Sequence, residues 1–270
     1  MDISTEISTI NNLTRNCILI GIFSFFAFLG ISIFFANWAV KPVDEAWTHQ
    51  KQFIADASHE LKTPLTVILT NAELLKSGNY DNRQNTRFSD SILIMAKQMQ
   101  GLVEGLLELS RIDNGSMNTM MQTLNFSTLA ENVIYLFEPV YFENGLELNS
   151  EIDSDIHIKG SENHLKQVIE ILLDNALKYS VSPSQVHVTL QKQRTYCVLS
   201  VKNCGEHITD DDLKNIFKRF YRIDKSRNHT GSYGLGLSIA ESILAEHHGK
   251  IWAESKGEEN TFFVRLSLIS

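Results

Sequence analysis

The chain reads Ala57-Ser58-His59-Glu60-Leu61-Lys62-Thr63-Pro64-Leu65 in the middle of a segment with strong helical periodicity. Apolar residues recur there every three or four positions, which predicts the buried stripe of an amphipathic helix. The stripe comprises Phe53, Ala57, Leu61, Leu65, Ile68, Ala72 and Leu75. His59 falls on the opposite side of this helix, so we expect its side chain to face water. Pro64 cannot donate a hydrogen bond to the carbonyl of Glu60, so we expect a bend one turn after the histidine.

An exposed histidine in this position can act as a nucleophile. A neutral imidazole is reactive near pH 7, and a carboxylate beside it can take the proton from its second nitrogen. Glu60 is the candidate base, although adjacent positions of a helix do not face each other. Thr63 shares the face of His59, and its hydroxyl could position a water for attack on a phosphorylated His59. The alternative is that His59 is an ordinary solvated histidine, one of nine in the chain.

A second apolar stripe follows the turn-forming residues 77–82. Its members occupy two positions in seven, the pattern of a coiled coil or helical bundle. They are Ile92, Met95, Met99, Leu102, Leu106 and Leu109. A single hairpin cannot bury both stripes, so we expect two copies to pair into a four-helix bundle, as a homodimer. The alternative is that both helices pack on the domain that follows.

The segment before this hairpin is suited to a membrane. No charged residue lies between Arg15 and Lys41, and residues 17–40 are mostly Ile, Leu, Phe, Ala and Gly. That run can cross a bilayer core of about 30 Å, and it exceeds the apolar region of about 7 to 15 residues in a signal peptide. We expect a single transmembrane helix over residues 17–40. Residues 1–16 are too few to fold around a ligand.

The overall composition restricts the classes of function. The chain has 270 residues, 43% hydrophobic and 21% charged, which indicates roughly two folded domains. Its formal net charge of -8 argues against a protein that mainly clamps nucleic acid. The three cysteines, Cys17, Cys197 and Cys204, are widely spaced and predict neither a disulfide framework nor a zinc site.

The C-terminal half mixes strands with helices after a polar linker at residues 113–123. Alternating apolar residues predict strands, and a period near 3.6 predicts helices. The predicted strands are 146–151, 186–190, 197–201 and 262–268; the predicted helices lie near 127–141, 161–179 and 235–248, with Ser127 and Ser161 as N-caps. This order indicates an α/β sandwich with helices packed on one side of a mixed sheet.

Two clusters in this half offer groups that suit a nucleotide. Asn175, Lys178 and Tyr179 lie within one helical turn and supply an amide oxygen for a hydrated metal, an ammonium for phosphate and a ring for a base or sugar. Glycines in residues 231–239 let backbone amides approach an anion at a helix N-terminus. Each cluster taken alone is also compatible with an ordinary polar helix end or glycine turn.

These motifs together resemble those of the bacterial sensor histidine kinases of two-component systems. Residues 59–65 match the H-box pattern His-Glu-Leu-Lys-Thr-Pro-Leu, and the likeness extends over about residues 40–270. Leu172–Ser180 resembles the N-box, Val201–Ile208 the G1 box, Ile216–Arg222 the F-box and Gly231–Ile239 the G2 box. The resemblance implies that His59 accepts the γ-phosphoryl group of ATP and that Asn175 binds the Mg²⁺ that bridges the phosphates. It implies these nucleotide-binding residues: Asn175, Lys178, Tyr179, Asn203, Gly205, Arg219, Arg222, Gly231, Gly234, Gly236 and Leu237.

The sequence departs from the family pattern at three positions. Asn203 replaces the aspartate that accepts a hydrogen bond from the adenine amino group, and His207 replaces a glycine. Ile171 stands where related ATPases have a water-activating glutamate, so we expect slow ATP hydrolysis. Residues 223–230, with Lys225 and Arg227, are expected to form a mobile lid whose cations face the phosphates; the alternative is a solvated surface loop.

The resemblance implies an α+β multidomain fold: a short extracytoplasmic N-terminus (1–16), a transmembrane helix (17–40), a dimerisation and phosphoacceptor domain (41–112), a linker (113–123) and an ATP-binding domain (124–270). It implies a homodimeric histidine kinase in the cell membrane, with a cytoplasmic catalytic region, a response regulator as partner and no nucleic acid. Two alternatives stay open. Asn203, His207 and Ile171 would suit a signalling scaffold with a degenerate nucleotide site, and Thr63 would suit a sensor that acts mainly as a phosphatase.

Overall fold

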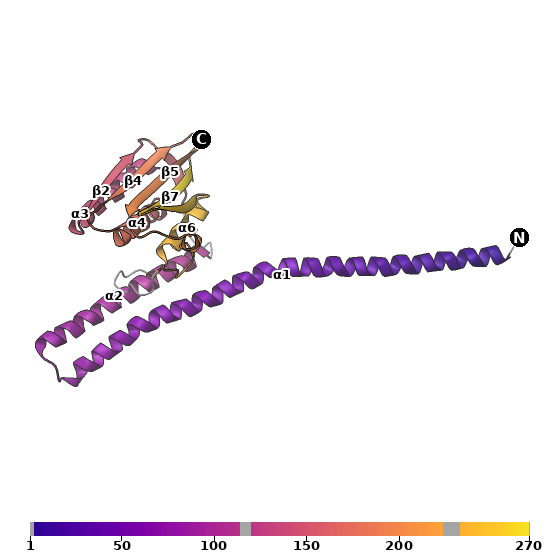
Figure 1. Cartoon of the computed structure of the whole chain (residues 1–270), viewed down its shortest axis with the longest axis horizontal. Coiled ribbons are helices and arrows are strands. Elements are labelled where there is room, and N and C mark those ends of the chain that lie inside the picture. Colours follow the sequence, from indigo (N-terminus) through magenta and orange to yellow (C-terminus); the bar gives the residue numbers. More distant parts are fainter. Residues whose placement is uncertain (1–2, 114–119, 224–232, 270) are drawn as a thin grey trace. The chain divides into compact units, whose positions relative to one another are not determined.

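A computed structural model describes residues 3–113, 120–223 and 233–269 of the chain. The chain divides into two compact units, Met1–Ser58 and His59–Ser270. Helix α1 (Ile3–Ser77) runs through the first unit and into the second, where its last turns form a hairpin with helix α2 (Asn82–Asp113) (Figure 1). The predicted transmembrane helix and phosphoacceptor helix are therefore one continuous helix, which runs through Pro42.

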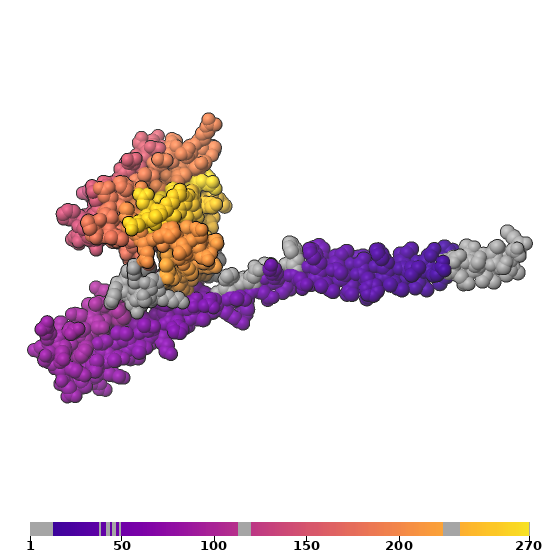
Figure 2. Space-filling view, in the orientation of Figure 1, coloured from indigo at the N-terminus to yellow at the C-terminus, as the bar shows by residue number. Residues whose placement is uncertain are grey.

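The N-terminal part of α1 contains one stretch that is long and apolar enough to cross a membrane. This stretch, Leu13–Lys41, has a mean hydropathy of 2.6, and none of its most apolar part is buried. Figure 2 shows it as an uncovered rod of side chains. Uncovered phenylalanines such as Phe23, which is 76% exposed, would be costly in water and suit a lipid environment.

The hairpin confirms the turn predicted at residues 77–82. Helix α1 ends at Ser77, and Asp81 caps α2. The Asp81 carboxylate accepts a hydrogen bond from the backbone N–H of Gln84 at 2.7 Å, and the Gln84 side chain accepts one from the Asp81 N–H at 3.2 Å. This reciprocal pair satisfies two amide donors that the start of a helix leaves unpaired.

The apolar stripes of the hairpin are only partly covered in a single chain. Leu102 and Leu109 on α2 are fully buried. Leu65, which belongs to the stripe predicted for α1, is 45% exposed. Leu93, which lies on α2 outside its predicted stripe, is 55% exposed. The hairpin therefore presents apolar surface that its own chain does not cover.

The C-terminal part is an α/β sandwich, as predicted. Its sheet has the order β2-β4-β5-β7-β6, with β2 parallel to β4 and the other neighbours antiparallel. The strands are β2 (Leu146–Ile152), β4 (Ser184–Lys192), β5 (Tyr196–Cys204), β6 (Lys250–Lys256) and β7 (Glu259–Ser267). A separate antiparallel pair is formed by β1 (Gln122–Asn125) and β3 (His157–Gly160).

Helices α3 (Phe126–Glu143), α4 (Glu162–Tyr179) and α6 (Gly236–Glu246) pack on the sheet, and α5 (Asp210–Leu213) is a single turn (Figure 1). Alternate residues of β4 and β5, such as Val188 and Leu199, are fully buried and form the core with apolar residues of α4 such as Ile169. The buried Tyr141 hydroxyl donates to the carbonyl of Leu173 at 2.7 Å and links α3 to α4. Helix α4 is therefore firmly held, and its last turn carries the N-box residues.

The structure corrects one predicted cap and adds four elements. Ser127 is not the N-cap of α3; Asn125 is, and its side chain accepts a hydrogen bond from the Thr128 N–H at 3.1 Å. The Ser127 hydroxyl instead donates to the carbonyl of Asp153. Ser161 occupies the N-cap position of α4 but makes no side-chain cap bond. Elements β1, β3, β6 and α5 were not predicted.

Candidate functional site

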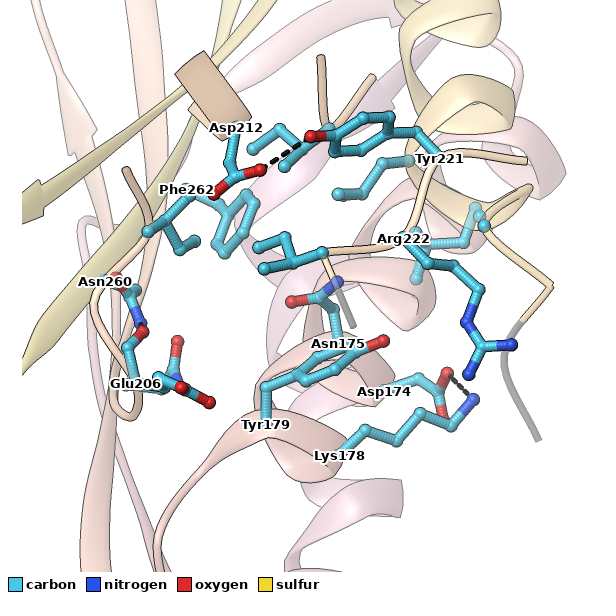
Figure 3. A pocket seen from close by; sticks show the side chains of 18 of the residues that line it. Asp174, Asn175, Lys178, Tyr179, Glu206, Asp212, Tyr221, Arg222, Asn260 and Phe262 are labelled. Carbon is cyan, nitrogen blue, oxygen red and sulfur yellow. Dashed lines mark hydrogen bonds and ion pairs between the residues drawn. The ribbon is translucent and has the colours of Figure 1, made fainter. Parts of the chain in front are cut away.

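A cavity of about 300 Å³ lies between the end of α4, the end of β5, the start of α6 and strand β7 (Figure 3). Eight of the predicted nucleotide-binding residues line it: Asn175, Lys178, Tyr179, Asn203, Arg222, Gly234, Gly236 and Leu237. Gly205 and Arg219 do not line it, and Gly231, Lys225 and Arg227 lie outside the described residues. Motifs spread over more than sixty positions of sequence thus meet around one cavity.

The last turn of α4 contributes a mixed set of polar groups. Asn175 points into the cavity beside the ring of Tyr179 (Figure 3). The Lys178 ammonium lies 2.5 Å from a carboxylate oxygen of Asp174, one turn before it. Since both side chains remain partly exposed, this ion pair is weak.

Two buried amides occupy the sheet side of the cavity. Asn203 on β5 and Asn260 on β7 are direct register partners and are 2% and 4% exposed. The Asn260 amide donates to the carbonyl of Glu206 at 2.9 Å. Gly205 lies beside both amides, and a Cβ there would come within 2.4 Å of the Tyr179 carbonyl oxygen. Gly205 therefore serves close backbone packing, although it does not line the cavity.

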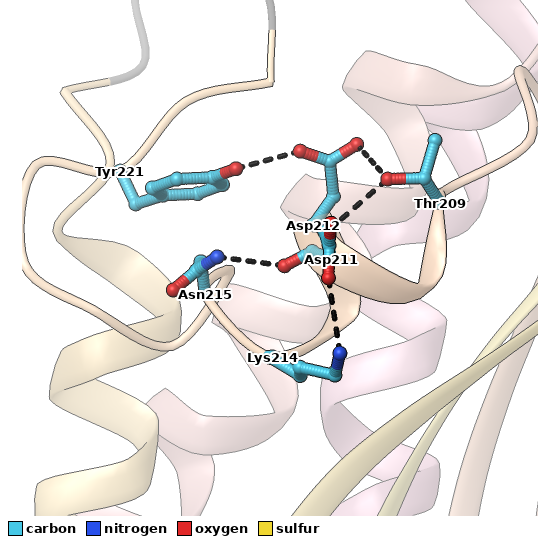
Figure 4. A network of polar contacts seen from close by, with 6 residues as sticks. All are labelled: Thr209, Asp211, Asp212, Lys214, Asn215 and Tyr221. Atoms are coloured by element: carbon cyan, nitrogen blue, oxygen red, sulfur yellow. Dashed lines mark hydrogen bonds and ion pairs between the residues drawn. The ribbon is translucent and has the colours of Figure 1, made fainter.

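A network of polar contacts fixes the F-box next to α5 (Figure 4). The Asp212 carboxylate accepts hydrogen bonds from the Tyr221 hydroxyl and the Thr209 hydroxyl, both at 2.6 Å. The bond from Thr209, and then that from Tyr221, lower the pKa of Asp212, while the Asp212 carboxylate raises the pKa of Tyr221. Asp212 and Tyr221 both line the cavity, so the network shapes its wall directly.

The F-box and the G2 box are joined through their backbones. The Phe220 N–H donates to the carbonyl of Gly234 at 2.9 Å. Gly234 has a φ of +69°, and a Cβ there would come within 2.5 Å of the Tyr221 carbonyl oxygen. Only glycine meets both conditions, which explains this glycine without reference to a ligand.

The H-box lies on α1 and does not contribute to the cavity wall. His59 is exposed, as predicted, Glu60 is half-buried, and Pro64 is buried. The Thr63 hydroxyl is 3.4 Å from the His59 carbonyl oxygen, to which it donates. The imidazole is thus accessible from the solvent.

Sequence reasoning missed several residues that line the cavity, among them Thr209, Asp212, Asn260 and Phe262. A sequence pattern could have identified Thr209 and Asp212, because Thr-x-x-Asp is typical of a helix N-terminus. The Thr209 side chain does cap α5. Asn260 had none, since it reaches the cavity only through the pairing of β7 with β5.

Two family models match the chain. The His Kinase A (phospho-acceptor) domain matches residues 49–115, and the histidine kinase-, DNA gyrase B- and HSP90-like ATPase matches residues 160–269. The first range contains His59, and the second contains all eight predicted residues that line the cavity.

Curated relatives are similar to most of the chain. Sensor protein DltS of Streptococcus agalactiae serotype III (strain NEM316) is 34% identical over 247 residues, which is 92% of this chain and 62% of DltS. Sensor histidine kinase YkoH of Bacillus subtilis (strain 168) is 35% identical over 227 residues, which is 83% of this chain and 49% of YkoH. The chain therefore spans less than two thirds of the length of these relatives.

Solved structures agree on the fold. Histidine kinase ThkA, in a complex with the response regulator protein TrrA, matches with a TM-score of 0.69 at 23% identity, over 83% of this chain and 64% of that one. Acinetobacter baumannii histidine kinase AdeS matches with a TM-score of 0.63 at 22% identity, over 78% of this chain and 98% of that one. The fold, with a helical hairpin and an α/β sandwich, is therefore shared at low sequence identity.

Proposed function

Because this chain belongs to the sensor histidine kinases of two-component systems, we propose that it transfers the γ-phosphoryl group of ATP to His59 and then to an aspartate of a response regulator. The observation that carries the proposal is an exposed histidine in a His-Glu-Leu-Lys-Thr-Pro-Leu segment, in the same chain as a cavity with the nucleotide-binding motifs at its walls.

The cavity walls suit the parts of ATP. Asn203 and Tyr179 supply an amide and a ring for the base and sugar, while Lys178 and Arg222 supply cations for the phosphates. Gly234 and Gly236 lie at the N-terminus of α6, where backbone amides and the helix dipole favour an anion. Lys178 leaves Asp174 when the more highly charged phosphates arrive.

The donor set of the cavity also fits Mg²⁺. Among the described residues, no group of three or more His, Cys, Asp or Glu side chains could hold a metal ion. Mg²⁺ does not require such a group, because it keeps several waters and is held by one or two protein oxygens together with substrate phosphates. The amide oxygen of Asn175 would be the protein ligand. When bound, the ion would neutralise part of the charge on the phosphates.

The transfer of the γ-phosphoryl group takes place at a ring nitrogen of His59. One ring nitrogen of His59 forms a bond to the γ-phosphorus while the bond from that phosphorus to the β,γ-bridging oxygen breaks, and ADP leaves. Glu60 receives the proton from the other ring nitrogen. The apolar Ile171 lines the cavity and cannot activate water, so transfer to His59 competes well with hydrolysis.

The remaining steps concern partners and location. We propose that phosphoryl-His59 donates to the regulator and that Thr63, freed from the His59 carbonyl, positions water in the reverse reaction. A homodimer would cover the apolar surface that a single hairpin leaves exposed. Residues 17–40 would cross the membrane, with residues 41–112 and 124–270 as phosphoacceptor and ATP-binding domains on the cytoplasmic side, where ATP is available.

Incubation of the full chain in lipid nanodiscs with γ-labelled ATP tests this proposal. We expect label that survives alkali and is lost in acid, because that is the behaviour of a phosphorus–nitrogen bond. The label should vanish in His59→Gln and persist in His187→Gln, a matched change on strand β4 outside the cavity. Absence of label in a wild-type chain that binds ATP would support the scaffold alternative and overturn the proposal.

A further inference from the structure

The last two turns of α3 present apolar side chains to solvent, on the side of the helix opposite its buried residues. These side chains recur at helical spacing, and we call them the α3 stripe: Tyr135, Leu136, Pro139 and Phe142. The first and the last of them, Tyr135 and Phe142, are 71% and 84% exposed. Aromatic and aliphatic side chains exposed together in one contiguous stripe indicate a surface that another molecule covers.

The charged residues around the α3 stripe are acidic. Residues 126–156, which include α3 and the edge strand β2 beside it (Figure 1), contain seven acidic residues and no Lys or Arg. Glu131 and Glu138 follow one side of the stripe, and Glu143 lies at its end. Within the described part of the chain, no cationic side chain pairs with these three carboxylates. The surface therefore combines apolar side chains with uncompensated negative charge.

An open groove of about 700 Å³ continues the stripe beyond the end of α3. Phe142 and Pro183 line this groove together with two carboxylates, Glu138 and Glu147. The Glu147 carboxylate accepts a hydrogen bond from the Gln185 amide at 2.8 Å and can accept others. Such a groove suits a cation on an aliphatic stem, because the ring and the proline can contact the stem while the carboxylates bind the charged head.

Pro139 leaves a backbone acceptor within the stripe. A proline has no N–H, so the carbonyl of Tyr135 lacks the donor that residue 139 would supply in an uninterrupted helix. A Lys or Arg side chain of a bound molecule can donate to this carbonyl. The backbone and the carboxylates therefore favour the same kind of group, a cationic donor.

These features favour a basic helix over two other occupants. A bilayer that contains anionic lipids would repel the carboxylates. A second copy of the same stripe, in two-fold contact, would set like charges against each other. A helix with an apolar stripe and flanking Lys or Arg side chains matches both the spacing of the apolar residues and the charge around them.

We propose that the α3 stripe and its groove are the docking site of a partner protein, which contributes an amphipathic helix with Lys or Arg beside its apolar stripe. None of the four residues of the α3 stripe lines the nucleotide cavity. The proposal goes beyond the phosphoryl transfer to His59 and does not depend on it.

Binding of a model helix to the full chain, in nanodiscs of zwitterionic lipid, tests the proposal. The probe is a labelled amphipathic peptide of Leu, Lys and Ala, and the reference peptide has the same composition in an order without helical periodicity. Fluorescence anisotropy gives both dissociation constants, and empty nanodiscs show how much peptide binds to lipid. We expect the amphipathic peptide to bind the chain at least about tenfold more tightly than the reference peptide.

Phe142→Lys should weaken the binding of the amphipathic peptide at least about tenfold, because it removes an apolar contact and adds a like charge. The matched control is Met120→Lys, which adds the same charge at an apolar residue outside the stripe that is 87% exposed. Since the general attraction of a basic peptide to an acidic chain changes equally in both variants, only Phe142→Lys should lose affinity.

Equal binding of the two peptides to the wild-type chain would overturn the proposal, and this comparison needs no variant to fold. Equal affinities of the amphipathic peptide for Phe142→Lys and Met120→Lys would also overturn it. If Phe142→Lys instead lowers the fraction of dimer in detergent, the stripe belongs to an interface between two copies. If it abolishes sedimentation of the nanodisc-bound chain with phosphatidylserine vesicles, the stripe belongs to a lipid contact. Either of these two results would contradict a protein helix as the occupant.

Discussion

Glu60 lies next to His59 on α1 and is half-buried, whereas the histidine is exposed. If Glu60 takes the imidazole proton, Glu60→Gln should slow the phosphorylation of His59 by about 100-fold or more. The affinity for ATP should not change, because Glu60 does not line the cavity. The rate of label incorporation and the displacement of a fluorescent ATP analogue measure the two effects separately. Glu73→Gln on the same helix is the control, and equal rates in both variants would exclude Glu60 as the base.

Asp212 provides a prediction about pH. Its hydrogen bonds from Thr209 and Tyr221 hold the pKa of the folded carboxyl below its ordinary value of 3.8. The unfolded chain then binds more protons in the window below that value, so the stabilisation is present above about pH 4 and is lost as the pH falls further. The melting temperature should therefore fall more steeply from about pH 5 to about pH 3 in the wild type than in Asp212→Asn.

The control for this measurement is Asp211→Asn, since the Asp211 side chain is 91% exposed and its ion pair with Lys214 is screened by solvent. Parallel curves for the wild type and Asp212→Asn would show that the network in Figure 4 does not stabilise the domain.

Some residues of the cavity could be predicted from the sequence, and others could not. The cluster on α4 could be predicted, because residues within one turn of a helix are close in space as well as in sequence. It comprises Asn175, Lys178 and Tyr179. Asn260 could not be predicted, because its place opposite Asn203 depends on which strands pair and in which register. Arg219 has an F-box match but does not line the cavity.

At the scale of the backbone elements, Gly234, which lies just before α6 and contacts the F-box, is constrained in two ways. Gly234→Ala would combine a left-handed backbone conformation with a Cβ 2.5 Å from the Tyr221 carbonyl oxygen. The conformation alone costs about 1–2 kcal/mol, and the overlap should add to this cost and reduce the affinity for ATP. Urea denaturation and nucleotide displacement measure the two losses.

Gly257→Ala is the matched control, because Gly257 has a φ of +63° but no atom within 4 Å of its would-be Cβ. It should show the conformational cost alone and bind ATP normally. If the two variants lose the same free energy of unfolding, the close approach of Gly234 to Tyr221 does not contribute to stability.

Elements with a clear period could be predicted, and short ones could not. Strands β4 and β7 alternate buried residues with less buried ones, and α4 repeats its apolar residues every three or four positions. Strands β1 and β3 have only four residues each and are held by pairing with each other, so no periodicity marks them. Ser127 was a wrong cap, because its hydroxyl serves a tertiary contact with Asp153 rather than the helix end.

For the molecule as a whole, the exposed apolar residues of the hairpin lead to a prediction about dimerisation. Ile94 on α2 is 53% exposed, close to Leu93 at 55%. If a second copy covers this surface, Ile94→Lys should lower the fraction of dimer in detergent solution at a fixed protein concentration, because a buried unpaired charge is strongly disfavoured. Chemical cross-linking and mass photometry measure that fraction. Lys97→Ala is the control, and a wild-type dimer fraction in Ile94→Lys would argue for a different interface.

Direct localisation of the transferred phosphoryl group decides whether the chain works as described. The full chain is incubated with ATP and Mg²⁺, digested under alkaline conditions that preserve phosphohistidine, and mapped by mass spectrometry. The result expected is a single modified peptide with the phosphoryl group on His59, lost after brief acid treatment. A phosphoryl group on a serine, a threonine or another histidine, or none on a chain that binds ATP, would contradict the assignment of His59.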